Sequence, residues 1–506
     1  MKIFTAAQIR EADAFTIQHE PISSTDLMER AACRCAAWIG EHYTPDHSFY
    51  IFCGKGNNGG DGLVITRKLL EDGYIATACL LQYGSKASED YLHNLRLLQE
   101  KFPGNMLEIA ALADFPEIHT PAVIVDAIFG TGLNKPIDGW LAGIIHKINE
   151  QRNRLTILAV DMPSGLMADN SSRGMPVIQA HHTLSFEFYK LAFMLPENAA
   201  NVGQAHILHI GLHHDYITQT PARYHITDRE MMRTIYQPRD PFGHKGTYGH
   251  ALLVAGSYGK LGAAVLSAQA CLRAGAGLLS CYVPTCGYDI MQMSEPCAMC
   301  ITDQQADHST HFHEQADARY KTIGIGPGLG TASATARSLE KLLDAYKRPM
   351  VIDADALNLM SVYPFLLYKI PAGSILTPHP KEFERLFGPT ENDVQRLELL
   401  SKQAVALQIY ILLKGRYSAI ACPDGAVYFN PTGNPGMATG GSGDVLAGIL
   451  TGLLAQDYSP KAAAILGAWL HGYAGDLAAA QLSQEAMTAA DIIHFLGKAF
   501  QEGIYR

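Results

Sequence analysis

The sequence predicts an α/β protein with two domains, each built on a mostly parallel β-sheet. Three observations lead to this expectation. The 506-residue chain is longer than one hydrophobic core usually serves. Short apolar runs repeatedly end in glycine-rich turns that are followed by helical patterns. The pattern pauses once, at Thr218-Gln219-Thr220-Pro221, so we expect domains at residues 1–222 and 223–506.

The first half starts with a helix and a glycine turn. The helix is expected to begin near Asp26, where Glu29 is placed to complete a capping box. A strand at residues 49–53 runs into a glycine-rich turn at residues 54–62, and a helical pattern follows from Leu63. This order predicts a Rossmann-like three-layer α/β sandwich.

Two later apolar runs of the first half, residues 123–125 and 157–160, are each followed directly by an aspartate. One carboxylate at a strand end is often only a helix cap. Several strand ends that share one edge of a parallel sheet favour a ligand site instead. The side chains expected to converge there are Asn58, Asp126, Asp161 and Ser164.

The second half repeats the order of strand, glycine turn and helix, which again predicts a mostly parallel sheet. A helix is expected at residues 263–274. The strands expected in this half are residues 251–256, 323–325, 351–352, 375–377 and 410–413.

A second glycine-rich turn, at residues 433–444, precedes the apolar helical segment 445–454. Glycines let backbone N–H groups approach a phosphate, and a helix N-terminus adds unpaired donors and partial positive charge. Asp444 ends this turn and is a candidate general base, which we expect the helix dipole to keep ionised. The alternative is that Asp444 only caps the helix.

Composition excludes several classes of function. The net charge is −10 and no basic block is present, which argues against binding nucleic acid or an anionic membrane. Charges interrupt the N-terminal segment and no apolar run reaches membrane-spanning length, so we expect a cytoplasmic protein. The ten cysteines lack a paired metal-binding spacing, and we expect reduced thiols and no zinc.

Both glycine-rich segments resemble the motifs of one enzyme family. Residues 57–62, Asn-Asn-Gly-Gly-Asp-Gly, are similar to the signature of NAD(P)H-hydrate epimerases. Residues 433–444, together with 353–358 and 377–383, are similar to the motifs of NAD(P)H-hydrate dehydratases of the ribokinase-like superfamily. The whole chain therefore resembles the bifunctional nicotinamide-nucleotide repair enzymes, and the resemblance implies a ribokinase-like α/β/α fold for residues 223–506.

The resemblance implies repair of NADH or NADPH that has gained water across the C5–C6 double bond of the nicotinamide ring. The first domain would interconvert the R and S epimers of the C6 hydroxyl. The second would phosphorylate the S epimer with ADP and Mg²⁺, release AMP and phosphate, and restore the reduced cofactor. Relatives also imply a homo-oligomer.

The resemblance further implies the binding residues of the first domain. The hydrate would contact Asn57, Asn58, Gly59, Gly60, Asp61, Gly130, Thr131, Gly132, Leu133, Asn134, Lys135, Pro136 and Asp161. A potassium ion would be held by Asn58, Asp126 and Ser164, whose oxygens suit a hard cation. We add that Asp161 is a candidate for moving the proton.

In the second domain the resemblance implies separate contacts for the hydrate and for the nucleotide. The hydrate would be lined by Ala263, Gly328, His379 and Asp444. The adenine nucleotide would be bound by Lys414, Gly415, Arg416, Tyr417, Ser418 and Gly443. Asp444 would serve as the base for the C6 hydroxyl.

Two other functions fit parts of the sequence. One is a vitamin or metabolite kinase, which would release a phosphorylated product instead of free phosphate. The other is a non-catalytic binding module, as is known for some proteins that are similar to the first half. The presence of Asn58, Asp126, Asp161 and Ser164 argues against the binding module.

Overall fold

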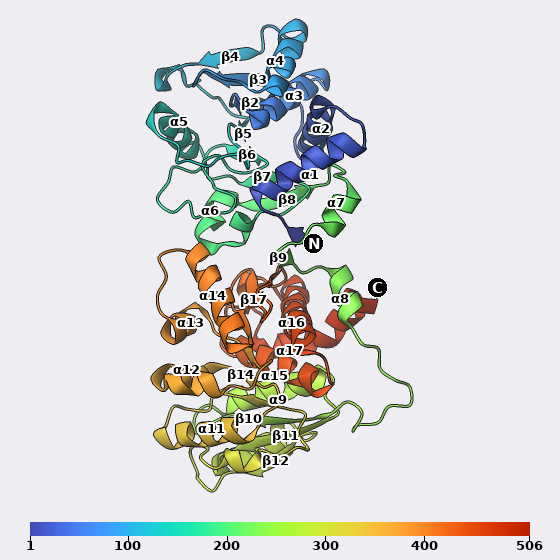
Figure 1. Cartoon of the computed structure of the whole chain (residues 1–506), viewed down its shortest axis with the longest axis vertical. Coiled ribbons are helices and arrows are strands. Elements are labelled where there is room, and N and C mark those ends of the chain that lie inside the picture. Colours follow the sequence, from blue (N-terminus) through green and yellow to red (C-terminus); the bar gives the residue numbers. More distant parts are fainter. Residues whose placement is uncertain (506) are drawn as a thin grey trace. The chain divides into compact units, whose positions relative to one another are not determined.

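The computed structural model describes residues 1–505 and divides into two compact units. The N-terminal unit contains Lys2–Ala222 and the short segment Asn392–Val394. The C-terminal unit contains Met1, Arg223–Glu391 and the chain from Gln395 onward. Figure 1 colours the first unit from blue to green and most of the second from green to red.

The N-terminal unit is built on a seven-stranded sheet in the order β4-β3-β2-β5-β6-β7-β8. All neighbouring strands are parallel. The strands are β2 Ser48–Cys53, β3 Ile75–Leu81, β4 Met106–Ile109, β5 Ala122–Ala127, β6 Thr156–Val160, β7 His182–Phe186 and β8 Gln204–Leu208, with the short β1 at Lys2–Ile3. The helices are α1 Ala6–His19, α2 Ser24–His42, α3 Asn57–Glu71, α4 Glu89–Lys101, α5 Gly139–Glu150, α6 Ala199–Val202 and α7 His214–Gln219.

Helices cover both faces of this sheet, which makes the unit three layers thick. Successive side chains of a strand point to opposite faces. Ile51 therefore packs with residues of α2, α3 and α4 on one face, whereas its neighbour Phe52 packs with residues of α5 on the other. The expected three-layer α/β architecture and its strands are confirmed (Figure 1).

Two helix starts differ from the expectation. Helix α2 begins at Ser24 because Ser23 and Asp26 form the capping box, and Glu29 instead bonds to Arg67. Helix α3 begins at Asn57, so the Asn-Asn-Gly-Gly-Asp-Gly segment forms its first turns and not a loop.

Close packing explains the glycines at this helix start. A Cβ on Gly62 would lie 2.7 Å from Ala127 Cβ and 2.8 Å from Cys53 Sγ. Glycine therefore lets the start of α3 lie directly on β2 and β5.

The C-terminal unit has a longer sheet, in which β9-β18-β17-β16-β15-β14-β13-β10-β11-β12 lie side by side. Only the hairpin pairs β16–β17 and β17–β18 are antiparallel among these strands. The strands are β9 Tyr224–Ile226, β10 His250–Val254, β11 Leu278–Val283, β12 Met299–Thr302, β13 Thr322–Ile325, β14 Val351–Ile352, β15 Ile375–Leu376, β16 Tyr410–Leu413, β17 Ser418–Ala421 and β18 Val427–Asn430. The helices are α8 Arg229–Ile235, α9 Leu261–Arg273, α10 Tyr288–Ser294, α11 Ser333–Ala345, α12 Ala354–Val362, α13 Pro380–Phe387, α14 Asp393–Leu407, α15 Ser442–Ala455, α16 Pro460–Leu482 and α17 Ala489–Phe500.

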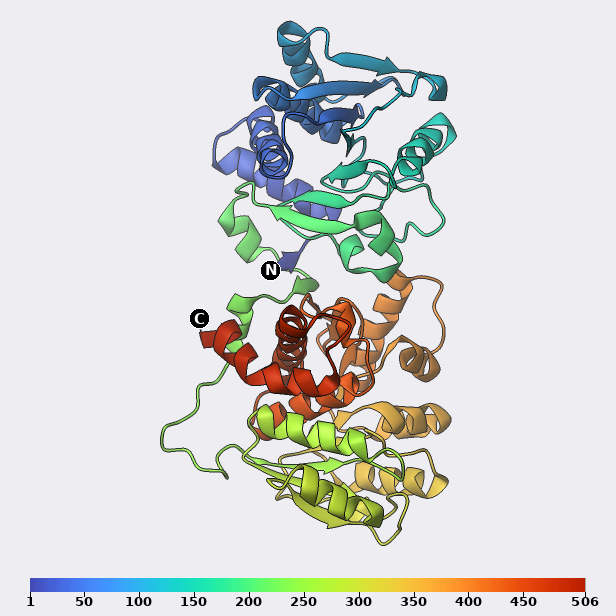
Figure 2. The same ribbon diagram turned by 180° about the vertical axis from the view of Figure 1, so that it is seen from behind.

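The largest core of this unit lies where α15, α16 and α17 pack on the middle of the sheet. Helix α15 is apolar almost all round and nearly every residue in it is buried, as expected for a central helix. Figures 1 and 2 show α11 and α12 on the other side of the sheet from α9. Within residues 1–505, no helix combines the length and the apolar character needed to cross a bilayer.

Helix α15 approaches α9 so closely that it needs glycine at the contact. A Cβ on Gly452 would lie 2.5 Å from the backbone oxygen of Cys271, and one on Gly448 would lie 2.2 Å from that of Ser267. The two glycines are four residues apart and therefore lie on one face of the helix.

We expect Gly452→Ala to lower the free energy of unfolding of the C-terminal unit by about 1–3 kcal/mol, because the methyl group overpacks the α9 contact. Gly497→Ala is the matched control, since Gly497 is an exposed helical glycine with open space around it. It should be neutral or should stabilise the unit by up to about 1 kcal/mol. Calorimetric unfolding of the full chain tests both, and equal effects would contradict the packing argument.

Candidate active sites

A cavity of about 550 Å³ opens at the carboxyl edge of the N-terminal sheet. Its walls come from the start of α3, the loop after β5, the end of β6 and helix α1. The predicted hydrate contacts that line it are Asn57, Asn58, Asp61, Gly130, Thr131, Gly132, Leu133, Asn134 and Asp161.

The other predicted hydrate contacts are not among the lining residues. Gly59 and Gly60 are buried behind the wall, where a Cβ on Gly59 would lie 1.7 Å from the backbone oxygen of Gly54. Lys135 and Pro136 are exposed on the loop after β5. Gly59 and Gly60 are therefore needed for close packing at the start of α3.

An ion pair between Asp161 and Lys190 lies at this cavity. Lys190 Nζ is 2.7 Å from Asp161 Oδ1, and its side chain is only 1% exposed. The ammonium group also donates to Ser185 Oγ and to the backbone oxygen of Phe186. The second carboxylate oxygen of Asp161 accepts the N–H of Thr131 at 3.1 Å. The carboxylate is thus held in one orientation between β6, β7 and the loop after β5.

The backbone at Asp161 is unusual, because its φ of +62° is a conformation that residues other than glycine rarely adopt. The N–H of Asp161 donates to the backbone oxygen of Leu184 at 2.8 Å, which holds this turn against β7. Such strain is typical of functional positions, where the surrounding structure stabilises it.

Asp126 and Ser164 lie behind the cavity and are fully buried. Asp126 accepts the Ser164 N–H at 2.7 Å, the Ser164 hydroxyl at 2.5 Å and the Ile128 N–H at 3.2 Å. Burial raises the pKa of Asp126 to about 6, although the bonds from Ser164 and Ile128 lower it in part. The Nδ2 and Oδ1 atoms of Asn58 are buried and have no hydrogen-bond partner.

Two further carboxyl groups, of Asp13 and Asp61, line the same cavity. Burial, followed by the neighbouring Asp161, raises the pKa of Asp13 to about 7, and Lys190 opposes this rise. Burial, followed by Asp161, Asp13 and Asp90, raises the pKa of Asp61 well above its usual value. The cavity therefore combines an ion-paired carboxylate with carboxyl groups that hold protons more readily.

The C-terminal unit carries a second site at the start of α15. Gly441, with φ +92°, turns the chain into the helix and places Asp444 in its first turn. Lys414 Nζ lies 2.8 Å from Asp353 Oδ1, and a Cβ on Gly443 would lie 3.2 Å from Lys414 Nζ. The structure thus brings together Asp353, Lys414, Gly443 and Asp444 from three separate segments.

The pKa of Asp444 shifts in the direction opposite to the effect of the helix dipole. Burial, followed by the nearby Asp353, raises it to about 6, although Lys414 opposes the rise. The sequence predicts that the helix dipole favours the ionised form, which alone would lower the pKa. The dipole is worth only about 0.3–1 kcal/mol at an exposed helix end, and here the loss of water outweighs it. The shift makes Asp444 a stronger base than an ordinary aspartate.

Asp355 connects three segments beside this site. Its carboxylate accepts the N–H of Gly330 at 2.8 Å, Lys260 Nζ at 3.1 Å and Asn358 Nδ2 at 3.2 Å. The loop before α9, the glycine loop after β13 and α12 are joined in this way. The predicted hydrate contacts Ala263 and Gly328 lie next to each other here, since a Cβ on Gly328 would lie 3.1 Å from Ala263 Cβ.

The remaining predicted contacts of this unit lie on two neighbouring loops. His379 caps α13, and its ring accepts the N–H groups of Lys381 and Glu382. The backbone N–H of Lys414 bonds to the oxygen of Pro378, which links this loop to the Lys414–Ser418 loop. Arg416 donates to the backbone oxygens of Pro431 and Gly433. Arg416 therefore fixes the glycine-rich turn of residues 433–444.

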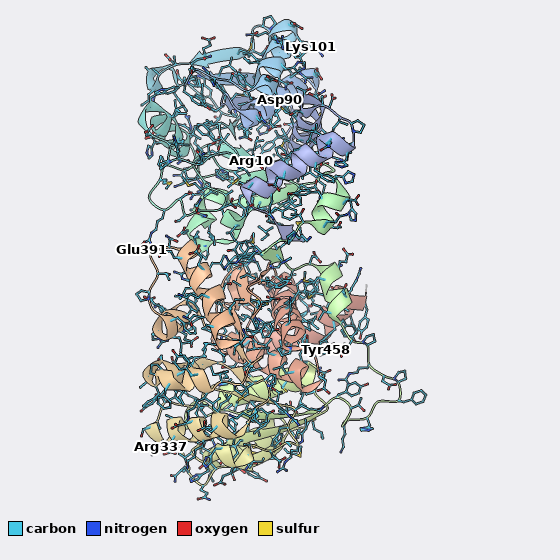
Figure 3. All side chains as sticks on the ribbon, viewed as in Figure 1. Arg10, Asp90, Lys101, Arg337, Glu391 and Tyr458 are labelled. Atoms are coloured by element: carbon cyan, nitrogen blue, oxygen red, sulfur yellow. The ribbon has the colours of Figure 1, made fainter. Side chains whose placement is uncertain are left out.

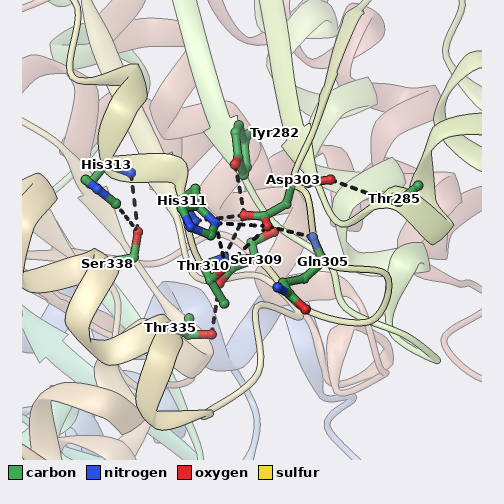
Figure 4. A network of polar contacts seen from close by, with 10 residues as sticks. All are labelled: Tyr282, Thr285, Asp303, Gln305, Ser309, Thr310, His311, His313, Thr335 and Ser338. Carbon is green, nitrogen blue, oxygen red and sulfur yellow. Dashed lines mark hydrogen bonds and ion pairs between the residues drawn. The ribbon is translucent and has the colours of Figure 1, made fainter.

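A polar network surrounds Asp303 (Figure 4). The network holds the segment 303–311 in place. The backbone oxygen of Asp307 in this segment accepts the N–H of Tyr258 at 2.8 Å, which supports the loop before α9. Burial raises the pKa of Asp303, but the backbone bonds outweigh it and lower the pKa to about 2. The groups that donate to Asp303 include the Tyr282 hydroxyl and the N–H groups of Gln305, Thr310 and His311.

Sequence reasoning assigned no role to several residues at the two sites: Asp13, Lys190, Asp353, Asp355 and Asp303. Asp353 and Asp355 stand in a quoted motif and directly follow a predicted strand, which is a usable signal. Asp13 lies in a helix and Lys190 in a loop, and neither position carries a local pattern that indicates a cavity.

Two family models match the chain. The model described as NAD(P)H-hydrate dehydratase matches residues 251–498, and the model described as YjeF-related protein N-terminus matches residues 24–192. The chain is 39% identical to the bifunctional NAD(P)H-hydrate repair enzyme Nnr of Moorella thermoacetica, over 98% of this chain and 96% of that protein.

Solved structures resemble the C-terminal unit. A ribokinase-like superfamily protein from Enterococcus faecalis is 28% identical with a TM-score of 0.50, covering 57% of this chain and 99% of its own. An ADP/ATP-dependent NAD(P)H-hydrate dehydratase from Bacillus subtilis, co-crystallised with ATP/Mg²⁺, is 32% identical with a TM-score of 0.49, covering 55% and 98%. The expected ribokinase-like fold of this unit is confirmed.

We expect Lys190→Met to destabilise the N-terminal unit by about 3–5 kcal/mol, because it leaves the Asp161 carboxylate without its buried cation. Adding Asp161→Asn should restore most of this loss, since a neutral amide needs no counter-charge. Lys101→Met is the control: Lys101 is exposed and pairs with Glu71, and its loss should cost less than about 1 kcal/mol. Denaturant unfolding of the wild type, Lys190→Met, Asp161→Asn, the double variant and the Lys101→Met control measures the coupling, and additive losses in the double variant would refute it.

Proposed function

The chain belongs to the family of bifunctional NAD(P)H-hydrate repair enzymes, and we propose that each of its two units carries out one step of that repair. The enzyme epimerises hydrated NAD(P)H and dehydrates it to NAD(P)H with ADP or ATP. The observation that supports the division is the presence of two separate carboxylate sites, one at the Asp161–Lys190 pair and one at Asp444 beside Lys414.

In the proposed epimerase domain, residues 1–222, the hydrate would occupy the 550 Å³ cavity. Asp161 would contact the nicotinamide ring and take up or return the proton of the C6 hydroxyl. The N–H groups at the start of α3 and in the loop 130–134 would bind polar groups of the nucleotide.

Potassium would bind behind this cavity. The carboxylate of Asp126, the amide oxygen of Asn58 and the oxygens of Ser164 are donors of the kind a hard cation prefers. The unpartnered buried Oδ1 of Asn58 fits such a ligand. Bound potassium would supply positive charge beside the buried Asp126 carboxylate. Within residues 1–505, no group of three or more His, Cys, Asp and Glu side chains is arranged to hold a metal ion, so the amide and hydroxyl oxygens are needed.

In the proposed dehydratase domain, residues 223–506, Asp444 would take the proton of the C6 hydroxyl while this oxygen attacks the terminal phosphoryl group of ADP. AMP leaves, and loss of phosphate from C6 with a proton from C5 restores the double bond. Ala263, Gly328 and His379 would line the hydrate.

The nucleotide would lie against residues 414–418 and Gly443. The Lys414 ammonium, now paired with Asp353, would bind nucleotide phosphate. Asp353 offers carboxylate oxygens that suit Mg²⁺, which would neutralise phosphate charge.

Two expectations remain predictions. The first is a homo-oligomer, which light scattering of the purified chain would test. The second is a cytoplasmic location, which fractionation of the source cells would test.

We expect Asp161→Asn to slow interconversion of the R and S hydrates by at least about 100-fold, because a positioned proton-transfer group is removed. Dehydration of the purified S hydrate with ADP should continue at the original rate. Chiral chromatography of the hydrates and release of free phosphate measure the two steps. Asp138→Asn, at an exposed position outside the cavity wall, is the control. Equal loss of both activities would contradict separate sites.

We expect Asp444→Asn to lower dehydration of the S hydrate by at least about 100-fold. The base form of Asp444 is required, and its pKa is raised to about 6. The wild-type rate should therefore be full above this value and fall as the pH drops below 6, and the variant should lose this dependence.

Recovery of dihydronicotinamide absorbance and release of free phosphate follow the reaction. Asp424→Asn, an exposed change elsewhere in the unit, should leave it unchanged. Near-normal turnover of Asp444→Asn would remove this residue from the mechanism, and a phosphorylated product without phosphate release would favour a kinase.

A further inference from the structure

Helix α1 contributes a carboxyl group to the N-terminal cavity that no motif indicated. Asp13 lines this cavity together with Asp61 and Asp161. Its half-buried side chain makes no hydrogen bond or ion pair within residues 1–505. Two residues earlier, Glu11 is exposed and accepts the Tyr216 hydroxyl at 3.0 Å. The two acids of α1 thus differ sharply: one is used in packing and the other faces the cavity.

The charged groups around Asp13 come from four segments. Arg10 lies one turn earlier on α1 and lines the same cavity, and Figure 3 labels it on this helix. Asp61 comes from α3, Asp161 follows β6, and Lys190 precedes the turn Leu191–Met194. Since Lys190 is bonded to Asp161 at 2.7 Å, the cation stabilises that carboxylate directly, and Asp13 has no such partner.

An independent observation shows that this wall is built for a polar ligand. The amide of Asn58 lines the cavity and is about nine-tenths buried. Its Oδ1 atom is the one assigned above to potassium, and its Nδ2 donor also has no partner in the protein. A buried amide without partners is costly, so its bonds are expected to go to a bound group. Asp13 therefore faces a site that receives polar atoms.

Inversion at C6 by loss of water and its return to the opposite face requires proton transfer to one oxygen and from another. The hydroxyl that leaves must gain a proton, and the water that adds to the opposite face must lose one. Asp161, paired with a cation, suits the second task, and a carboxyl group that keeps its proton suits the first. One group with both roles would have to reach both faces of the ring.

We propose that Asp13 is a second catalytic carboxyl group of the N-terminal unit, which donates a proton to the departing C6 hydroxyl while Asp161 deprotonates the incoming water. The proposal rests on the proposed epimerase function of this unit. The C6–O bond breaks and its electron pair leaves with water, while the nitrogen lone pair forms the N1=C6 bond. Water then adds to C6 from the other face, the π pair returns to nitrogen, and its proton passes to Asp161. Proton transfer from Asp161 to Asp13 restores the starting state.

Asp13→Asn in the full chain tests this role. We expect kcat for conversion of the purified R hydrate to the S hydrate, measured without ADP, to fall by at least about 100-fold with little change in KM. Dehydration of the S hydrate should be unchanged. Wild-type epimerisation should decline as the pH rises above about 7, where Asp13 loses its proton, and the variant should lack this decline.

The matched control is Glu11→Gln on the same helix, which should epimerise as the wild type does. Asp13→Glu keeps the acid and should retain both measurable turnover and the alkaline decline. If Asp13→Asn fails to give a wild-type melting transition, Asp13→Glu decides, and loss of the alkaline decline in that folded variant would overturn the proposal.

The origin of the oxygen at C6 after epimerisation gives a separate check. Epimerised hydrate formed in H₂¹⁸O should carry ¹⁸O at C6, and retention of ¹⁶O would overturn the proposed bond breaking. A wild-type chain that does not epimerise at all would refute the proposed function itself. Wild-type turnover with an equally fast Asp13→Asn would refute only the role of Asp13.

Discussion

Helices on both faces of a parallel sheet leave its carboxyl edge as the place where polar side chains gather. In the N-terminal unit, α2–α4 cover one face and α5 covers the other. Polar side chains that follow β5 and β6 therefore lie at the edge, where Asp161 meets the start of α3. The C-terminal unit obeys the same constraint, because Asp353 follows β14 and Lys414 follows β16. Both candidate sites therefore lie at the same place in their folds, the carboxyl edge of a parallel sheet.

The number of hydrogen-bond donors around a buried aspartate decides whether its pKa is raised or lowered in this chain. Asp303 is enclosed by backbone N–H groups, which lower its pKa to about 2. Asp444 has few such donors, so burial and Asp353 raise its pKa to about 6. Asp303 accordingly serves as a fixed hydrogen-bond acceptor beside the loop before α9. Asp444 is placed to exchange a proton near neutral pH.

Close backbone packing accounts for several glycines, among them Gly59, which the family resemblance assigns to ligand contact. Gly59 and Gly62 bring the start of α3 onto the sheet, and Gly448 and Gly452 bring α15 onto α9. The side chains proposed to face ligand are Asn58, next to Gly59, and Asp444, one turn before Gly448. A glycine in such a motif thus positions a polar residue, since any Cβ would push the helix away from its support.

The sequence by itself determined the two-domain α/β class, the main strands and the edge residues Asp126, Asp161 and Asp444, because each is encoded by local order: an apolar run, a turn and a helical period. It did not reveal Asp13 or Lys190, since neither stands in a local pattern that indicates a cavity, and both reach the site through packing of distant segments. It also misjudged the proton affinity of Asp444, because burial depends on everything packed around the residue. Tertiary structure decided these features, since desolvation and charge pairing are set by neighbours in space, whereas periodicity and turns are set by neighbours in the chain.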